Sequence, residues 1–519
     1  MSASRSENAF KNISTAIGGQ LLNIVLNFIC RTIFIYTLGK SYLGVSGLFS
    51  NILTIMSLAE LGIGDAIIYK LYKPVAEKDY AEIRKYIAFY RKAYWIIGTF
   101  IFCVGLVLIP FLDYLIKGGE DLEHIRLIYF LYLFNTASTY FFAYKKTIII
   151  ADQKGYIDTI NRYAFLVLQN VLQIAVLLIW KNFILYLFVQ IVVNFIANVN
   201  ISIKSTKMYP SLKGNAEPLS KEESKSFLKQ TSALVLHKIG GVCVSGTDNL
   251  LISSFVGIAT VGIYSNYVTI LGIPQALLAY VFAPLTASVG NLIHTSSKEH
   301  IRSVFKRMFL VNFWLYGFCA ICLFVLANDF IGAVWLDQSF LLTIPTLFFV
   351  VLNFYLTGMR QTVSAFKSSS GLFWNDRFRP IAEAAVNLAV SLALLHYFGL
   401  IGVIIGTTVS AITTTIWVEA KVVYKNVLKQ SVLHYFARYL IYFLIAILVG
   451  ILTFFATCWL EVDGILTFIL KVLICILVIN VSFAALFFKT AEFKEIVNNY
   501  LKPLYKKILK KVKCLHDGN

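Results

Sequence analysis

The chain has 519 residues, of which 58% are hydrophobic and only 14% are charged. Its mean hydropathy of +0.74 excludes a water-soluble globular domain and a disordered chain. The formal net charge is +19, but the basic residues cluster between long apolar stretches, which is typical of a membrane protein and not of a nucleic-acid-binding protein.

Fourteen apolar windows are long enough to span a bilayer, where each must satisfy its own backbone hydrogen bonds and therefore forms a helix. In chain order they cover residues 13–38, 43–69, 93–112, 125–149, 158–180, 183–203, 228–256, 261–293, 308–328, 340–366, 378–398, 400–424, 435–459 and 465–488. We therefore predict an all-α polytopic membrane protein with about 14 transmembrane helices. The first window is longer than a signal-peptide core, so we expect it to be a retained helix.

The distribution of Lys and Arg predicts the orientation in the membrane. If the amino terminus is cytoplasmic, the inside segments hold 37 of the 46 basic residues and the outside loops hold four. The outside loops carry acids instead, for example Asp113, Glu123 and Glu461. We therefore expect both termini to lie in the cytoplasm.

The two parts of the chain that precede residue 424 repeat each other weakly. Gly39 and Gly44 are followed by Phe49-Ser50-Asn51, and Gly257 and Gly262 are followed by Tyr264-Ser265-Asn266. The two glycine pairs share one offset, which places six helices over the next six and predicts two parallel six-helix repeats. The predicted domains are an N-terminal lobe (1–203), a basic linker (204–227), a C-terminal lobe (228–424), two extra helices (435–488) and a tail (489–519).

The tail from residue 489 alternates apolar residues with lysines. This pattern predicts an amphipathic helix on the anionic lipids of the inner leaflet.

The two six-helix repeats would form two parallel bundles with a central cleft near the membrane midplane. This is the geometry that alternating-access transport requires.

Charges inside spanning helices cost on the order of 3 kcal/mol, so each one indicates a partner or a wet cavity. Arg31 and Asp248 lie at corresponding depths of the first helix of each repeat. They are either a pair across the cleft, or two separate sites for an anion and a cation. The structural alternative is a buried ion pair that holds the two halves together.

Further charges lie close to the inner ends of helices. His237, Lys238 and Arg360 are candidate ligands for a diphosphate that enters from inside, although Lys238 and Arg360 are also within reach of the lipid headgroups. Glu60 and Asp65 join Asp248 as candidates for binding a coupling proton or sodium ion. Glu383 and Glu419 are expected to pair with Arg377, Arg379 or Lys421 instead.

The sequence indicates no cofactor and no metal site. Cys319 and Cys322 form a CxxC within an apolar run, without a nearby His or second cysteine pair, so we interpret them as small apolar helix residues. There is no P-loop, no GxSxG and no HExxH motif.

Several stretches of the chain resemble the polysaccharide-transporter family, the Wzx-like oligosaccharide-lipid flippases. They are residues 31–51 (RTIFIYTLGKSYLGVSGLFSN), 58–64 (LAELGIG), 71–74 (LYKP), 248–253 (DNLLIS), 262–267 (GIYSNY), 374–380 (WNDRFRP), 399–403 (GLIGV) and 406–407 (GT). The resemblance extends from the first predicted helix to the end of the twelfth.

The resemblance implies membership of the multidrug/oligosaccharidyl-lipid/polysaccharide (MOP) flippase superfamily, with two MATE-like six-helix lobes and a cationic central cavity. It implies a flippase that exports undecaprenyl-diphosphate-linked oligosaccharide units for capsule, O-antigen or exopolysaccharide synthesis, with a polysaccharide polymerase as a further partner. Protons, sodium ions or the membrane potential would drive it. In related lipid II flippases, a groove at the two extra helices is thought to hold the lipid tail, and the last two helices here are candidates for that role.

Two other functions remain open from the sequence. A multidrug or small-cation antiporter of the same superfamily would need an anionic cavity, which Arg31, Lys238 and Arg360 argue against. A membrane glycosyltransferase or polysaccharide polymerase would be expected to have a sizeable outside loop with catalytic residues. The longest predicted outside loop, residues 113–124, has only about a dozen residues.

Overall fold

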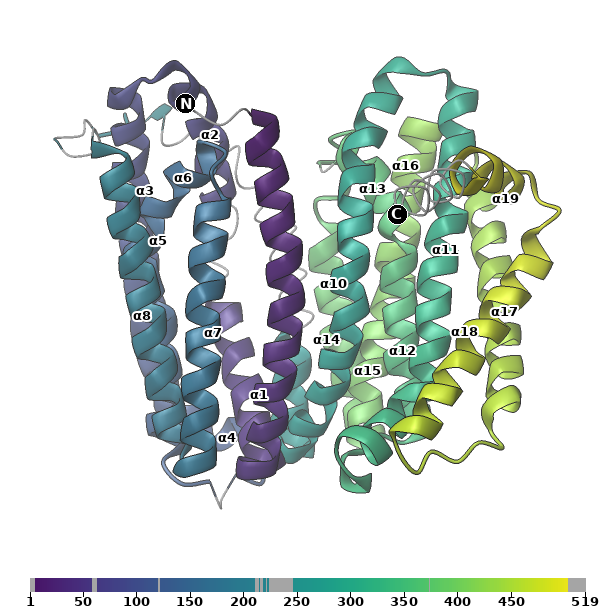
Figure 1. Ribbon diagram of the computed structural model, residues 1–519, viewed down its shortest axis with the longest axis horizontal. Helices are drawn as coiled ribbons and strands as arrows, with labels where there is room; N and C mark the ends of the chain where they lie inside the picture. Colours follow the sequence, from purple (N-terminus) through teal and green to yellow (C-terminus); the bar gives the residue numbers. More distant parts are fainter. Residues whose placement is uncertain are drawn as a thin grey trace, which may run out of the picture. The chain divides into compact units, whose positions relative to one another are not determined.

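The computed structural model describes residues 5–57, 63–119, 122–210, 214, 218–220, 222–223, 246–372 and 374–502. In these ranges every regular element is helical, which confirms the predicted all-α fold (Figure 1). The chain forms two compact units. The first consists of residues 1–266 and 380–403, and the second of residues 267–379 and 404–519. The lobes at 1–203 and 228–424, which the repeat suggests, stay a prediction.

The first unit is built from long helices that pack along their lengths, with α7 against α1 and α8, and α5 against α3 and α8. Its main elements are α1 (Arg5–Met56), α2 (Ile63–Glu77), α3 (Tyr80–Leu108), α4 (Leu112–Leu115), α5 (Ile125–Ala143), α6 (Thr147–Ala151), α7 (Tyr156–Ile179), α8 (Phe183–Met208) and α14 (Arg379–Phe398, from Pro380 on). The π-helical turn η5 (Ile252–Val256) and the start of α10 (Ile258–Thr295) also belong to it.

The second unit is organised around α11 (Lys298–Asp329), which packs against α12, α17 and α18 (Figure 1). Its other elements are the rest of α10, α12 (Ile344–Met359), α13 (Gln361–Ser369), most of α15 (Leu400–Ser410), α16 (Trp417–Val423), α17 (Leu433–Thr457), α18 (Ile465–Phe487) and α19 (Ala491–Ile496). Short turns include η6 (Phe330–Trp335), η8 (Trp374–Asp376), η9 (Ala411–Ile416) and η10 (Tyr424–Leu428).

Within the described residues, ten helices are long and apolar enough to cross a membrane, so the predicted number of 14 is not confirmed. The difference has local causes. One candidate span, Ser14–Met56, covers the first window and much of the second. The window at 228–256 lies mostly outside the described residues, and α12 has only 16 residues. Helix α5 is also not among the ten, and its second half carries Asn135 and several Thr and Ser residues.

Small residues bring helices into close contact, as is usual where lipid supplies no hydrophobic driving force for helix association. A Cβ added at Gly105 of α3 would lie 2.3 Å from Leu133 of α5. One at Gly98, two turns earlier on the same face, would lie 2.9 Å from Tyr140. These glycines therefore set the distance between α3 and α5.

The repeat predicted at Gly39 and Gly257 is visible in the backbone. Both residues interrupt a helix with positive φ, at 82° and 142°. The following segments then touch each other reciprocally within the first unit. A Cβ on Gly44 would lie 2.0 Å from the carbonyl oxygen of Ile258, and a Cβ on Gly262 would lie 2.1 Å from that of Lys40. Because Lys40 and Ile258 are separated by the same offset as Gly44 and Gly262, the two contacts are equivalent in the repeat.

The element boundaries support the same repeat. Helices α3, α5 and α8 begin at Tyr80, Ile125 and Phe183, and helices α11, α12 and α15 begin at nearly the same offset from them. The helix starts at Tyr80 and Lys298 are both capped by a side chain, from Asp79 and Ser297 respectively. Duplication of the six-helix pattern therefore explains most of the described chain up to residue 428, while α17 and α18 follow outside it.

Candidate functional site

Arg31 is held in the first unit by the start of α10. Its Nη2 donates to Ser265 Oγ at 2.7 Å and to Asn266 Oδ1 at 2.8 Å, and its Nε donates to Asn266 Oδ1 at 3.0 Å. Ser265 donates its own proton to the Gly262 carbonyl and accepts from Arg31 through the same oxygen. Both acceptors are neutral, and within the described part of the chain Arg31 forms no ion pair with a carboxylate. Among the described residues, no carboxylate therefore neutralises the positive charge of the Arg31 guanidinium.

Asn266 adds a second donor at the same place. Its side chain is fully buried, and among the described residues its Nδ2 has no hydrogen-bond partner, because only its oxygen is used by Arg31. A buried amide nitrogen without an acceptor is costly unless a ligand or water satisfies it. Arg31 and Asn266 thus form a small site with one charged and one neutral donor, which suits an anionic group.

Asp248 is buried in the helical segment 246–251 of the same unit, with 8% of its surface exposed. The sequence left open whether it pairs with Arg31. The hydrogen bonds of Arg31 go to Ser265 and Asn266 instead, so that ion pair is not formed in this structure. The assignment of Asp248 to ion coupling stays a prediction.

Arg360 is part of a buried network of five charges in the second unit. Its Nε donates to Glu419 Oε2 at 3.2 Å, and Lys367 Nζ lies 2.7 Å from Glu419 Oε1 and 2.8 Å from Asp376 Oδ2. Arg379 Nε lies 3.0 Å from Asp376 Oδ2, and its Nη2 lies 3.4 Å from Glu419 Oε1. The network joins the C-terminus of α12, α13, η8, the start of α14 and α16.

The five residues named here place three cationic side chains around two carboxylates. The side chains of Lys367, Asp376, Glu419 and Arg379 are at most 8% exposed, whereas that of Arg360 is 22% exposed. Removing one member of a buried network leaves an uncompensated charge, at a cost of about 3–5 kcal/mol. The four buried residues therefore fix Arg360, which is the member accessible from outside.

The second unit also holds an apolar groove of 560 Å³ between α11, α12 and α17. Its walls combine aliphatic residues with aromatic side chains such as Phe324, Phe348, Phe443 and Phe455. Of the described residues that line it, Tyr355 is the one with a polar side-chain atom. The sequence predicted a lipid groove at the two extra helices. The groove found here uses α17 but has no lining residue from α18.

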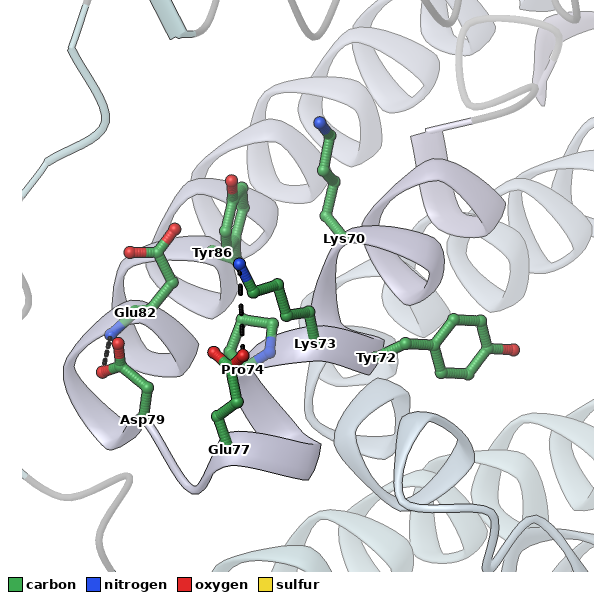
Figure 2. A pocket seen from close by; sticks show the side chains of 8 residues that line it. All are labelled: Lys70, Tyr72, Lys73, Pro74, Glu77, Asp79, Glu82 and Tyr86. Carbon is green, nitrogen blue, oxygen red and sulfur yellow. Dashed lines mark hydrogen bonds and ion pairs between the residues drawn. The ribbon is translucent and has the colours of Figure 1, made fainter.

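A second pocket of 560 Å³ lies where α2 ends and α3 begins (Figure 2). It is lined by side chains of both signs, namely Lys70, Tyr72, Lys73, Pro74, Glu77, Asp79, Glu82 and Tyr86. Lys73 reaches Glu77 at 4.0 Å, and Asp79 accepts from the backbone of Ala81 and Glu82. The pocket is thus a mixed-charge end of a helical hairpin, and we assign it no ligand.

The start of α3 also binds the linker that follows α8. Lys85 Nζ lies 2.8 Å from Glu223 Oε1, and the Glu223 side chain accepts from the backbone of Ser220. The hydrogen bond from Lys85 is the main reason why the pKa of Glu223 is lowered to about 2. Part of the predicted basic linker is therefore attached to the first unit by a carboxylate.

The other predicted site residues cannot be placed. His237 and Lys238 lie outside the described residues, as does Glu60. Asp65 belongs to α2, but its side chain is not among the described ones. Of the seven residues proposed from the sequence, the structure thus describes the side chains of Arg31, Asp248 and Arg360.

Sequence reasoning predicted one contact of the charged network and missed the rest. The expected pairing of Glu419 with Arg379 is confirmed at 3.4 Å. The roles of Lys367 and Asp376 were missed, because Lys367 counts only as a basic residue of a predicted inside segment and Asp376 appears only within the resembling stretch 374–380. A pair of opposite charges on the two sides of a Ser-Ser-Ser-Gly turn was the available signal.

Comparisons with known proteins agree with this fold. Residues 9–289 match the family model described as polysaccharide biosynthesis protein. No curated protein matches the sequence. The solved structure of the lipid II flippase MurJ in an inward closed conformation is similar with a TM-score of 0.66 and 14% identity, over 92% of this chain and 99% of MurJ.

Multidrug transporters have the same fold. An inward-facing multidrug resistance MATE family transporter of the MOP superfamily is similar with a TM-score of 0.59 and 16% identity, over 77% of this chain and 94% of its own. A point mutant of the Vibrio cholerae MATE transporter VcmN gives a TM-score of 0.55 and 14% identity, over 82% of this chain and 99% of its own. At these identities the likeness concerns the fold. The family match, which covers more than half of the chain, and this fold together show that the chain is a multi-pass membrane protein of the polysaccharide biosynthesis protein family, built like the transporters of the MOP superfamily.

Proposed function

We propose that the chain is a flippase that moves undecaprenyl-diphosphate-linked oligosaccharide units from the inner to the outer leaflet of the bacterial cytoplasmic membrane. The observation that carries this proposal is the apolar groove between α11, α12 and α17, because a polyprenyl chain must stay in an apolar environment while its polar head crosses. The family match to polysaccharide biosynthesis supports a glycan cargo. No chemical bond changes in such a step.

Arg31 and Asn266 form the candidate binding site for the diphosphate at the polar end of the cargo. A diphosphate presents several anionic oxygens, and a guanidinium with an adjacent amide donor can bind two or more of them. In this proposal the head group enters from the cytoplasm, binds at Arg31, and leaves on the outside after the two lobes have rocked. Asp248 is the candidate for a coupling proton or sodium ion, and the membrane potential is the alternative driving force.

Native mass spectrometry of the protein purified from its own membranes tests the cargo. We expect a polyprenyl diphosphate glycan, or the corresponding polyprenyl phosphate, among the lipids that remain bound. In parallel, liposomes with the purified protein should move a fluorescent lipid-linked oligosaccharide across the bilayer. Exchange of an organic cation for protons, without any movement of the lipid-linked glycan, would support the antiporter alternative and overturn the proposal.

The proposed direction of transport requires both termini to be cytoplasmic. Single cysteines at Lys73 and Glu461, in a background without native cysteines, would lie on opposite sides of the membrane. Both positions are exposed, and nearly all loop Lys and Arg residues are on the side of Lys73. An impermeant thiol reagent should label the Glu461 position in intact cells and the Lys73 position only after the membrane is opened. The reverse pattern would show that the orientation is wrong.

A further inference from the structure

The groove of the second unit contains a polar feature that an apolar chain alone does not explain. Tyr355 of α12 lines the groove and is buried, with only 3% of its surface exposed. Among the described residues, its hydroxyl has no hydrogen-bond partner. Buried tyrosine hydroxyls usually have one. Tyr355 therefore points to a ligand that brings an acceptor into the groove.

A second hydroxyl in the same state lies next to it. Tyr439 of α17 packs its ring edge-to-face against that of Tyr355, with centroids 6.3 Å apart. Its hydroxyl oxygen is also buried and, in the part of the chain that the structure describes, is not hydrogen-bonded. The pair thus comes from two of the three helices that form the groove. Both hydroxyls are neutral donors at one end of an apolar slot.

The charged network lies beyond this end of the groove. Arg360 is the C-cap of α12, little more than one turn after Tyr355. The two carboxylates of the network, Asp376 and Glu419, are surrounded by Lys367 and Arg379 as well as Arg360. The order along the second unit is therefore an apolar slot, two hydroxyl donors, and the Arg360 guanidinium at the edge of a charged cluster.

We infer that Tyr355, Tyr439 and Arg360 form a binding site for the phosphate of a polyprenyl phosphate whose chain occupies the groove. The inference rests on the proposed function, and it adds a second anion site to the one at Arg31. A phosphate diester or monoester has acceptor oxygens for both hydroxyls and a charge for the guanidinium. A polyprenyl alcohol would fill the slot but would bring no negative charge to interact with Arg360. This site would hold the carrier lipid by the junction between its chain and its head.

The test uses the full-length protein in detergent micelles and native mass spectrometry with three probes, which are undecaprenyl phosphate, undecaprenol and phosphatidylglycerol. We expect the wild-type protein to bind the phosphate at least about 100-fold more tightly than the alcohol, about tenfold for each of the two hydroxyls. The double variant Tyr355→Phe/Tyr439→Phe keeps both rings and should lose most of this preference, about tenfold for each charge-assisted hydrogen bond removed, while its binding of undecaprenol stays unchanged. Tyr442→Phe is the matched control on α17, because Tyr442 packs on Phe309 and Phe313 and does not line the groove.

Three results would overturn the inference. They are a double variant that keeps the preference, a wild-type protein that binds phosphate and alcohol equally, and a wild-type protein that prefers phosphatidylglycerol to undecaprenyl phosphate. None of these results decides the proposed function, because export of surface glycan by the same variants is measured separately in cells. Export that continues in the double variant despite a lost preference for phosphate would still support the site as a carrier-binding site with a minor effect on turnover.

Discussion

Replacing Arg31 with alanine is expected to abolish glycan export, and replacing it with lysine is expected to preserve part of it. Arg31 is a half-buried cation whose hydrogen-bond acceptors, Ser265 and Asn266, are neutral, so an incoming diphosphate meets an uncompensated charge. Charge-assisted hydrogen bonds contribute about 1.5–3 kcal/mol each, so losing two of them weakens binding by roughly 100-fold or more. Lysine restores the charge but not the planar pair of donors. Surface glycan, measured by antibody or lectin binding, is the readout.

Membrane abundance must be measured in the same cells, because Arg31 also connects α1 to the start of α10. If this structural role dominates, Arg31→Ala will lower the amount of folded protein and export in proportion. Arg162→Ala is the matched control, since Arg162 is an exposed arginine on the spanning helix α7 whose contacts among the described residues are with its neighbour Tyr163. Normal export by an abundant Arg31→Ala protein would refute the role of Arg31 as a ligand.

The transmembrane helices were largely predictable, because hydropathy reports directly on burial in lipid. The windows at 158–180 and 465–488 agree with α7 and α18 to within two residues at each end. The separation of the first two windows near residue 40 also agrees with the break at Gly39. Helices α12 and α5 were harder to assess, since α12 has only 16 residues and α5 carries Asn135 and several Thr and Ser residues.

The contacts of the site residues were not predictable from the same pattern. Arg31 and Asn266 are far apart in the chain, and a single sequence contains no signal for such a pairing beyond the weak repeat. The repeat made Asp248 a candidate partner of Arg31, because it places the two residues at equivalent depths in the membrane. It does not show which face of its helix each residue occupies. A helix that is apolar on all sides does not reveal which side faces protein. For the same reason the sequence could not show that α17, and not α18, lines the groove.

The groove yields the second large expected effect. Gly450 of α17 lines it, and a Cβ at this position would lie 3.7 Å from Ile321, which is an ordinary contact. The first atom of a larger side chain is therefore tolerated, and the remaining atoms of a phenylalanine must extend into the groove. We expect Gly450→Phe to fill the space that the polyprenyl chain needs and to abolish glycan export. The amount of folded protein should change little, because overpacking costs about 1–3 kcal/mol only where no free volume exists.

Leu448→Phe is the matched control for this experiment. Leu448 is two residues away on the same helix, is 62% exposed and does not line the groove, so the same aromatic ring is added on another face of α17. Export should then be normal in Leu448→Phe and absent in Gly450→Phe, and only the latter should retain less polyprenyl lipid after purification. If an abundant Gly450→Phe protein exports glycan at the normal rate, the carrier chain does not use this groove. The groove between α11, α12 and α17 then no longer supports the proposed function. If both variants lose export, insertion of α17 into the membrane and not the groove is the sensitive property.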